Sequence, residues 1–506
     1  MRRDPRHLFT TGTLEPKARA VVNTSEQKTA SMPAPTEADP KLPRLAEVPA
    51  FTQWMSQGWA EPERTPAATP DAAGAAAAHR AKLSAALPGV AFVVAAGWAP
   101  VRSNDCFYDF RPHSDFLWLT NCHAEGAVLV GTPSSGGHDY RLFVPAPALP
   151  GDPAFFTSAA HGELWVGAAH GPTHWEQALG LPTSPLGALD EALARLSGAE
   201  AAGNLDSSMV STHGLNPSAT LRRTLGELRL LKDEWEITEL RNSVIHTIEG
   251  FSQVINEIPT AIAGGGERWL QGTFDRVART HGHGPGYATI IGSGHHAPTL
   301  HWVRCDGPVQ ESELLLLDMG VEESSFYTAD VTRTFPANGR FTTAQREVHD
   351  LVEKAHRAGL AELAPGKNFT AFHTSIMEVI ANGLSDWGML PVSVDEALSP
   401  AGQHHRRWLV CGVGHHLGLD VHDCSSASYE EYQGAVLQEN MVLTVEPGLY
   451  FHKHDTMVPP ELRGMGVRLE DDLLITADGY ENLSDPLPID AAGIEAWMAA
   501  QAGAKA

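Results

Sequence analysis

The sequence has few of the features that mark several large classes of protein. Its five cysteines are scattered, and no two form a C-x-x-C pair, which argues against a disulfide framework or a zinc finger and suits a reducing compartment. No run of about 18 apolar residues occurs, so no segment is expected to span a membrane. The arginines near the N-terminus are not followed by an apolar stretch, which argues against a secretory signal. A cytoplasmic location is therefore expected.

Basic residues are also scarce. The chain has 36 lysines and arginines against 61 aspartates and glutamates, which gives a formal net charge of -25. Such a charge repels a phosphate backbone, so nucleic acid is not expected as a partner. Hydrophobic residues at 42% and charged residues at 19% are typical of a globular protein. Because 506 residues exceed the usual size of one hydrophobic core, more than one domain is expected.

The texture of the sequence divides the chain into four parts. Residues 1–46 are rich in proline, threonine, alanine and charge, and are predicted to be a disordered extension. Strand-like runs alternate with helical stretches over 47–228, which predicts an N-terminal α/β domain. Residues 229–490 mix strands and helices again and are predicted to be a second domain. Residues 491–506 are predicted to be a helical, alanine-rich tail.

Several elements can be assigned from local patterns. The alanine content of 72–87 favours a helix, and helical periodicity extends over 220–258 with a break near 231–233. Short apolar runs between turns, among them "VAFVVAAG" (90–97) and "FLWLTN" (116–121), are predicted to be strands.

Acidic residues interrupt apolar runs of the second domain. "LLLLD" ends on Asp318, and Asp330 follows twelve residues later; "MVLTVEPGLY" contains Glu446, and "GVRLEDD" contains Glu470. Strand alternation places Arg468 on the same face as Glu470. A buried carboxylate must be protonated, paired or bound to a metal. Taken singly, each acid fits a surface position or a salt bridge.

Together the four acids favour a metal centre. Crowded carboxylates repel one another and raise one another's pKa, and two divalent cations would cancel that repulsion. The segment "GVGHHLGLDVHD" (412–423) lies between the second and third acid and offers imidazoles. Oxygen ligands with one imidazole suit a hard or borderline cation such as Mn²⁺.

Several long segments resemble one known family. "DMGVEESSFYTADVTRTFP", "GVGHHLGLDVHD", "TVEPGLY" and "RGMGVRLEDD" are similar to the pita-bread metallopeptidases, and most closely to the Xaa-Pro aminopeptidases (aminopeptidase P). "RSNDCFYDFRPHSDFLWLTN" (102–121) resembles the N-terminal domain of that family. The resemblance implies an α/β (α+β) protein, with an N-terminal α/β domain followed by a pita-bread (creatinase/aminopeptidase) catalytic domain. It also implies release of the N-terminal residue from peptides with proline in second position.

The resemblance assigns residues position by position. It implies that a hydroxide bridging two divalent metals attacks the peptide, with Mn²⁺ favoured and Zn²⁺ or Co²⁺ as alternatives. Asp330 and Glu470 would bridge the ions. The full set of implied metal ligands is Asp318, Asp330, His415, Glu446 and Glu470.

The remaining implied roles concern proton transfer and substrate binding. Glu446 would be the general base, His301 would stabilise the oxyanion, and His422 would contact the scissile peptide and protonate the leaving nitrogen. Arg468 would orient the carboxylates, and Tyr450 would line the substrate pocket. Relatives are commonly homo-oligomers, so a dimer or tetramer is expected.

Other polar residues of these segments are expected to be structural. His416 is interpreted as packing, and Asp420 and Asp423 as hydrogen-bonding residues. Cys411 stands where many relatives have histidine, and is interpreted as a small buried hydrophobe. The remaining expectations are that His295 and His296 are loop residues, and that the extra residue between Asp318 and Asp330 falls in a hairpin turn at "EESSF".

Four other functions agree less well with the sequence than aminopeptidase P does. A prolidase would share all five ligands but cut only Xaa-Pro dipeptides, and the N-terminal domain argues against it. A non-catalytic pita-bread binding protein would be expected to lose ligands. A methionine aminopeptidase would leave the N-terminal domain unexplained. A dinucleotide loop at "GVGHHLG" is disfavoured because Leu417 replaces its third glycine.

Overall fold

The computed structural model describes residues 43–64 and 67–503. The predicted disordered extension over 1–46 therefore lies almost entirely outside the described residues. The described chain forms two compact units: the first contains 43–63, 99–110 and 147–169, and the second contains the rest. Within the described chain, no helix is both long and apolar enough to cross a bilayer.

The first unit is small and held together by aromatic contacts. Phe51 lies 5.4 Å from Phe156, and Trp59 lies 5.0 Å from Phe155, between ring centroids. The elements of this unit are η1 (Leu45–Glu47), α1 (Pro49–Met55), β2 (Val101–Ser103), β3 (Cys106–Phe107), α4 (Ala154–Thr157) and α5 (Glu163–Val166).

The N-terminal part of the second unit is a mixed sheet with helices. The order of its strands is β6-β5-β4-β1-β7-β8. The strands are β1 (Phe92–Ala95), β4 (Val128–Ser134), β5 (Gly137–Val144), β6 (Thr183–Pro185), β7 (Glu200–Gly203) and β8 (Asn216–Pro217). The helices are α2 (Pro70–Ala86), α3 (Ser114–Thr120), α6 (Pro172–Leu179), η2 (Leu186–Ala188), α7 (Leu189–Leu193), α8 (Ser207–His213) and α9 (Ala219–Arg229).

One element of this part differs from the prediction. The run "FLWLTN", predicted to be a strand, is the helix α3, and all seven residues of this helix are buried. A short apolar run buried on every side has no periodicity that separates a strand from a helix. His113 precedes the helix and accepts a hydrogen bond from the backbone N–H of Asp115, which favours the helical start.

The break in the long helical pattern is confirmed. Helix α9 ends at Arg229 and helix α10 (Glu234–Asn256) begins after Asp233. Asp233 and Glu236 form a capping box, in which each side chain accepts from the backbone of the other. This cap explains why the helix restarts at this point.

Among the described residues, the C-terminal part of the second unit contains four small antiparallel sheets. These are β10 (Ile290–Ser293), β11 (Leu314–Met319) and β13 (Val331–Pro336); β14 (Val442–Val445), β17 (Asp471–Thr476) and β18 (Gly479–Asn482); β9 (Gly282–Pro285) and β12 (Val321–Glu323); and β15 (Gly448–Tyr450) and β16 (Gly466–Arg468). A single bridge between Thr332 and Glu470 joins β13 to the β16–β17 connection.

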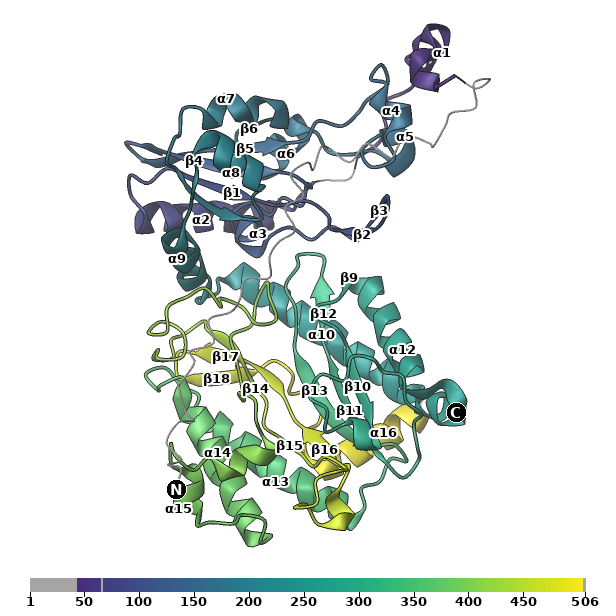
Figure 1. The fold of residues 1–506 in the computed structure, drawn as a ribbon, viewed down its shortest axis with the longest axis vertical. Helices are drawn as coiled ribbons and strands as arrows, with labels where there is room; N and C mark the ends of the chain where they lie inside the picture. Colours follow the sequence, from purple (N-terminus) through teal and green to yellow (C-terminus); the bar gives the residue numbers. More distant parts are fainter. Residues whose placement is uncertain (1–42, 65–66, 504–506) are drawn as a thin grey trace, which may run out of the picture. The chain divides into compact units, whose positions relative to one another are not determined.

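Helices cover these sheets in two groups (Figure 1). Helix α12 contacts β10, whereas α13 contacts β14 and β15. The helices are α10, α11 (Ile258–Thr260), η3 (Ala261–Gly265), α12 (Gly266–His281), η4 (Gly294–His296), α13 (Thr343–Leu360), α14 (Thr370–Asp386), α15 (Val394–Leu398), η5 (His404–Trp408), η6 (Pro460–Leu462) and α16 (Ala491–Gly503).

Strand β11 lies between two hydrophobic clusters. Leu314 and Leu316 belong to the cluster of α13 and α14, whereas Leu315 and Leu317 belong to the cluster of α10 and α12. Both faces of the strand are buried, which explains the continuous run of leucines. Alternation then places Asp318 on the face of Leu314 and Leu316, inside the protein.

Candidate metal centre

All nine residues assigned by the resemblance line one cavity of the second unit, with a volume of about 340 Å³. The five expected metal ligands lie there with His301, His422, Tyr450 and Arg468. The rest of its lining is Tyr287, Ala288, Ile290, Leu300, Val303, Cys411 and Val421.

The carboxylates reach this cavity from the ends and breaks of strands. Asp318 is the fifth residue of β11, and Asp330 directly precedes the paired strand β13. Glu446 lies in the break between β14 and β15, where Pro447 follows it, and Glu470 lies between β16 and β17. Strand interruptions therefore aim three of these four acids away from the regular ladders.

One histidine lies among these acids. The Nε2 atom of His415 is 3.3 Å from Asp330 Oδ2 and 3.6 Å from Glu446 Oε1. Ligand atoms of Asp330, His415 and Glu470 all lie within 4.8 Å of one another. The imidazole and two carboxylates are thus close enough to share one cation.

The electrostatics of the cavity disfavour ionised carboxylates. Burial raises the pKa of Glu446 to about 7, and the charge of Asp330 adds to this effect despite the opposing His415. Burial and the neighbouring Asp330 also hold the pKa of Glu470 well above its usual range. Burial raises the pKa of Asp318, although Arg468 opposes the shift.

Arg468 is the cation that ties this network together. Its guanidinium donates to the Asp318 carboxylate, and to the Tyr450 hydroxyl at 3.1 Å. Its Nε donates to Thr332 Oγ1 at 3.1 Å, and that hydroxyl donates to Glu470 Oε2 at 2.7 Å. Arg468 therefore acts on Asp318 directly and on Glu470 through Thr332.

The donor set fits divalent cations. Four buried carboxylates and one imidazole supply oxygen and nitrogen ligands in the ratio that a hard or borderline cation prefers. One arginine and one histidine do not balance four acids, and the raised pKa values of Asp318, Glu446 and Glu470 reflect this imbalance. Cations bound among these oxygens would remove it.

Sequence reasoning missed three polar residues that support this centre. Tyr287 donates to Asp318 Oδ1 at 2.6 Å, and Thr332 links Arg468 to Glu470. Asp472 Oδ2 accepts from the backbone N–H of Asp330 at 3.1 Å. The acidic run "LEDD" is the local signal that could have marked Asp472, whereas nothing local marks a single tyrosine or threonine.

The segment 412–423 divides its polar residues between two environments. His415 and His422 line the cavity, with ring centroids 4.5 Å apart. His416 is fully buried and packs on Phe369 and Tyr432, in line with its interpretation as a packing residue.

The two aspartates of this segment accept hydrogen bonds outside the cavity lining. Asp423 accepts from Arg229 and from Lys232 Nζ, the latter at 2.9 Å. Asp420 accepts from Ser114 Oγ at 2.6 Å and from Arg229 at 3.1 Å. These bonds fix the segment that carries His422.

The structure also describes the turn at 323–326 and the surroundings of Cys411. Glu323 to Phe326 form a tight turn closed by a hydrogen bond of 2.8 Å from Phe326 N to Glu323 O, so a turn lies at "EESSF" as predicted. Cys411 is half-buried; it lines the cavity and also packs against the hydrophobic cluster of α13 and α14. Burial raises the pKa of this thiol.

Comparison with known proteins places this geometry in a family. The model of metallopeptidase family M24 matches residues 239–477, and the model of the aminopeptidase P N-terminal domain matches residues 76–203. The predicted boundary between residues 228 and 229 falls between these ranges. Xaa-Pro aminopeptidase 2 of Streptomyces coelicolor is 44% identical over 459 residues, which cover 89% of this chain and 96% of that protein.

Other relatives agree. The Xaa-Pro aminopeptidase of Escherichia coli is 33% identical over 82% of this chain and 94% of its own length. The solved aminopeptidase PepP of Pseudomonas aeruginosa has a TM-score of 0.75 at 28% identity, covering 86% of this chain and all of that chain. Zinc-substituted E. coli aminopeptidase P in complex with product also has a TM-score of 0.75, at 29% identity, and the match covers 85% of this chain and 98% of that chain.

These matches extend over both the mixed sheet and the part that contains the cavity. They confirm the predicted fold class, an N-terminal α/β domain followed by a pita-bread catalytic domain. The chain belongs to metallopeptidase family M24, and within it to the aminopeptidases P.

Proposed function

We propose that this chain is a metal-dependent aminopeptidase that releases the N-terminal residue from peptides with proline in second position. The observation that carries the proposal is the single cavity lined by Asp318, Asp330, His415, Glu446 and Glu470. The relatives named Xaa-Pro aminopeptidase match nearly the full length of the chain and support this specificity.

Those five residues are the proposed ligands of two divalent cations. Asp330 and Glu470 are assigned as the bridging carboxylates, and Mn²⁺ is the proposed metal because four of the five ligands are carboxylates. When bound, the cations would lower the pKa of a water molecule and polarise the peptide carbonyl.

Glu446 is assigned as the residue that accepts a proton from the attacking water. Its side chain is 19% exposed, against 10% for Asp318 and 8% for Asp330. A water molecule therefore reaches Glu446 more easily than the other two. Burial raises the pKa of Glu446 to about 7, which is near the pH at which a carboxylate is most effective as a general base.

The two pocket histidines are assigned to the peptide bond. His301 lines the cavity on an exposed loop, where its ring can donate to the developing oxyanion. The proline nitrogen is a tertiary amide without an N–H, so it needs a proton as the bond breaks. Burial and the nearby His415 lower the pKa of His422, which makes its protonated form a stronger acid for that step.

Arg468 and Tyr450 are assigned to support and pocket shape. Arg468 holds the Asp318 carboxylate and, through Thr332, the Glu470 carboxylate. Tyr450 is held by Arg468 and presents its ring to the cavity. Neither residue is assigned a proton to transfer.

Turnover of three matched peptides tests the specificity. Peptides X-Pro-Y, X-Pro and X-Ala-Y are compared with and without added Mn²⁺, and the metal content of the loaded protein is measured. We expect X-Pro-Y to be cleaved, Mn²⁺ to increase its turnover, and about two metal ions to bind per chain. Cleavage confined to X-Pro would favour a prolidase. A protein without stoichiometric metal would favour a binding function.

Assembly and location are further parts of the proposal. The first unit exposes large apolar side chains, among them Trp54 at 71% and Trp165 at 60%. Exposed apolar surface of this kind favours association, so a homo-oligomer is proposed, and sedimentation velocity tests it. All five cysteines are free, which supports the proposed cytoplasmic location.

A further inference from the structure

Glu267 is a fully buried carboxylate near the start of α12, and it does not line the cavity. Its Oε1 accepts from the backbone N–H of Ser293 and lies beside His296 Nδ1, both at 2.8 Å. Its Oε2 accepts from the Trp302 indole and the backbone N–H of Gly307, both at 2.8 Å. Both oxygens are therefore fully used within the protein.

These partners are the two ends and two side chains of one loop. Ser293 is the last residue of β10, and Gly307 lies in the connection to β11. The backbone N–H of Glu267 also donates to the Gly307 carbonyl at 2.9 Å. One residue of α12 thus closes the loop of residues 294–307 at its base.

The same contacts fix the middle of the loop. The ring of Trp302 stacks on His296 with centroids 3.9 Å apart, and Arg304 Cζ lies 4.2 Å from the centroid of Trp302. A Cβ added at Gly307 would lie 2.3 Å from His296 Cε1, so a side chain there would displace the histidine. Trp302 is buried, whereas His301 directly before it is exposed and lines the cavity.

We propose that Glu267 is the positioning residue for His301. The proposal rests on the role assigned to His301 under the proposed function. His301 is exposed, so packing holds its side chain less firmly than that of the buried Trp302, and a misplacement of about 1 Å can lower a rate by about 100-fold. Glu267 removes that freedom by holding Trp302 and both ends of the loop. It reaches no metal ligand and touches no substrate.

A double-mutant cycle tests this assignment. Turnover of X-Pro-Y is measured for wild type, Glu267→Gln, His301→Ala and the double variant, each saturated with Mn²⁺. Glu267→Gln is expected to lower kcat about tenfold with KM nearly unchanged. In the His301→Ala background, the same change is expected to cost less than about twofold, because the residue that it positions is gone.

Two further variants keep the test valid if Glu267→Gln folds poorly. Trp302→Phe keeps the ring against His296 but removes the indole donor to Glu267, and it is expected to lower kcat about threefold only when His301 is present. Glu257→Gln is the matched control: Glu257, which directly follows α10, accepts from the indole of Trp269, an exposed residue of α12, at 3.0 Å. It is expected to leave kcat unchanged.

The outcomes separate a positioning role from a structural one. Metal content and thermal unfolding are measured for every variant, and Glu267→Gln is expected to bind as much Mn²⁺ as wild type. An equal loss of kcat with and without His301, or a loss of metal, would overturn the proposal. If wild type cleaves X-Pro-Y but His301→Ala is fully active, positioning of His301 is wrong and the aminopeptidase activity stands. A metal-loaded wild type that cleaves no Xaa-Pro substrate would remove the proposed function itself.

Discussion

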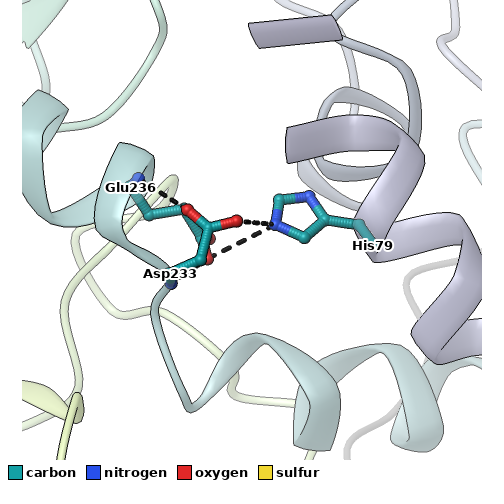
Figure 2. A group of neighbouring side chains, drawn as sticks. All are labelled: His79, Asp233 and Glu236. Atoms are coloured by element: carbon teal, nitrogen blue, oxygen red, sulfur yellow. Dashed lines mark hydrogen bonds and ion pairs between the residues drawn. The ribbon is translucent and has the colours of Figure 1, made fainter. Parts of the chain in front are cut away.

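One histidine, one aspartate and one glutamate come together at three places among the described residues of the second unit, and in two of these places two of the three residues are buried. His79, Asp233 and Glu236 form the first cluster (Figure 2), and Asp330, His415 and Glu470 form the second. In each cluster, potential ligand atoms of the three residues lie within 4.8 Å of one another. Their surroundings differ in the hydrogen bonds that the carboxylates already make.

In the first cluster every carboxylate oxygen has a donor. Asp233 Oδ1 accepts from the backbone N–H of Glu236 at 2.9 Å, and its Oδ2 lies 2.9 Å from His79 Nε2. Glu236 Oε1 accepts from Tyr327 at 2.7 Å and from Trp118 at 3.2 Å, and its Oε2 accepts from the backbone N–H of Asp233 at 2.8 Å.

His79 is held equally firmly. Its ring stacks on Trp118 with centroids 4.2 Å apart, and its Nδ1 lies 2.7 Å from the carbonyl oxygen of the same tryptophan. Burial disfavours the charged imidazolium, yet the hydrogen bonds to Asp233 and Glu236 outweigh it and raise the pKa to about 9. The first cluster is therefore an ion triad whose polar atoms all have partners within the protein, and it joins α2 to the start of α10.

In the second cluster the carboxylates lack such donors. Among the described residues, the only side-chain partner of the Asp330 carboxylate is His415, and Glu470 has one donor, Thr332. Asp318 and Glu446 add further negative charge in the same cavity. The same three residue types thus form a structural ion triad where protein donors hydrogen-bond to every carboxylate oxygen. They form a candidate metal centre where such donors are lacking.

The largest expected effect comes from removing one carboxylate charge in each cluster. Asp330→Asn is expected to lower kcat/KM about 1,000-fold or more, because several kcal/mol of metal-dependent stabilisation are lost. Asp233→Asn is expected to keep full metal binding. Turnover of X-Pro-Y and metal content per chain are measured for both. Loss of metal in Asp233→Asn, or full metal and turnover in Asp330→Asn, would contradict the comparison.

The stability of the folded protein, unlike metal binding, is expected to depend on the first cluster. His79→Leu removes the cation of the first cluster and leaves the buried Glu236 and the half-buried Asp233 uncompensated, so the free energy of unfolding should fall by about 3 kcal/mol. His416→Leu is the matched control, since His416 is equally buried but contributes ring packing without a side-chain hydrogen bond in the described chain. We expect it to change stability by less than about 1 kcal/mol in urea denaturation. Similar losses in both variants would mean that burial alone matters.

The contribution of His79 should depend on pH. Its folded pKa, about 9, lies above the usual value of 6.5, so the triad contributes its full stability below pH 6.5 and loses it as the pH rises through 9. The stability difference between wild type and His79→Leu should therefore shrink between pH 6.5 and 10. A difference that stays constant over this range would show that His79 is held as a neutral ring.

A feature of this structure could be predicted from the sequence where the residues that cause it are close together in the chain. Asp318, Glu446 and Glu470 were found because each interrupts an apolar run, and the resemblance then grouped them with His415. The helix over Pro70–Ala86 was predicted because its alanines favour helix within the segment itself. Local signals sufficed for these features.

The remaining features depend on partners that are distant in the sequence. His79 lies 154 positions before Asp233, and nothing in the alanine-rich helix marks it as charged. Glu267 reads as an ordinary acid at the start of a helix, although four partners from the following loop surround it. The strand predicted at "FLWLTN" was wrong for the same reason, because tertiary burial hides the periodicity of a short helix.

The smallest expected effect is a change in stability on removal of one carboxylate charge, and this change should have opposite signs in the two clusters. Burial and neighbouring acids raise the pKa of Glu470, so its ionised form destabilises the metal-free protein above its usual pKa of about 4.3. Glu470→Gln keeps an oxygen for the Thr332 hydroxyl and removes the charge. In EDTA at pH 8 we expect the free energy of unfolding of this variant to be about 1 kcal/mol higher than that of wild type. The free energy of unfolding of Asp233→Asn should instead be lower than that of wild type.

The stability difference between Glu470→Gln and wild type should also depend on the pH and on bound metal. Below pH 4 Glu470 is protonated in both the folded and unfolded states, so Glu470→Gln should then match wild type, and its advantage should appear as the pH rises. Saturating Mn²⁺ should reverse the order, because only wild type keeps all five ligands and gains stability from binding. Urea denaturation with and without metal measures both effects. A metal-free Glu470→Gln that is less stable than wild type would mean that Glu470, like Asp233, is satisfied without a cation.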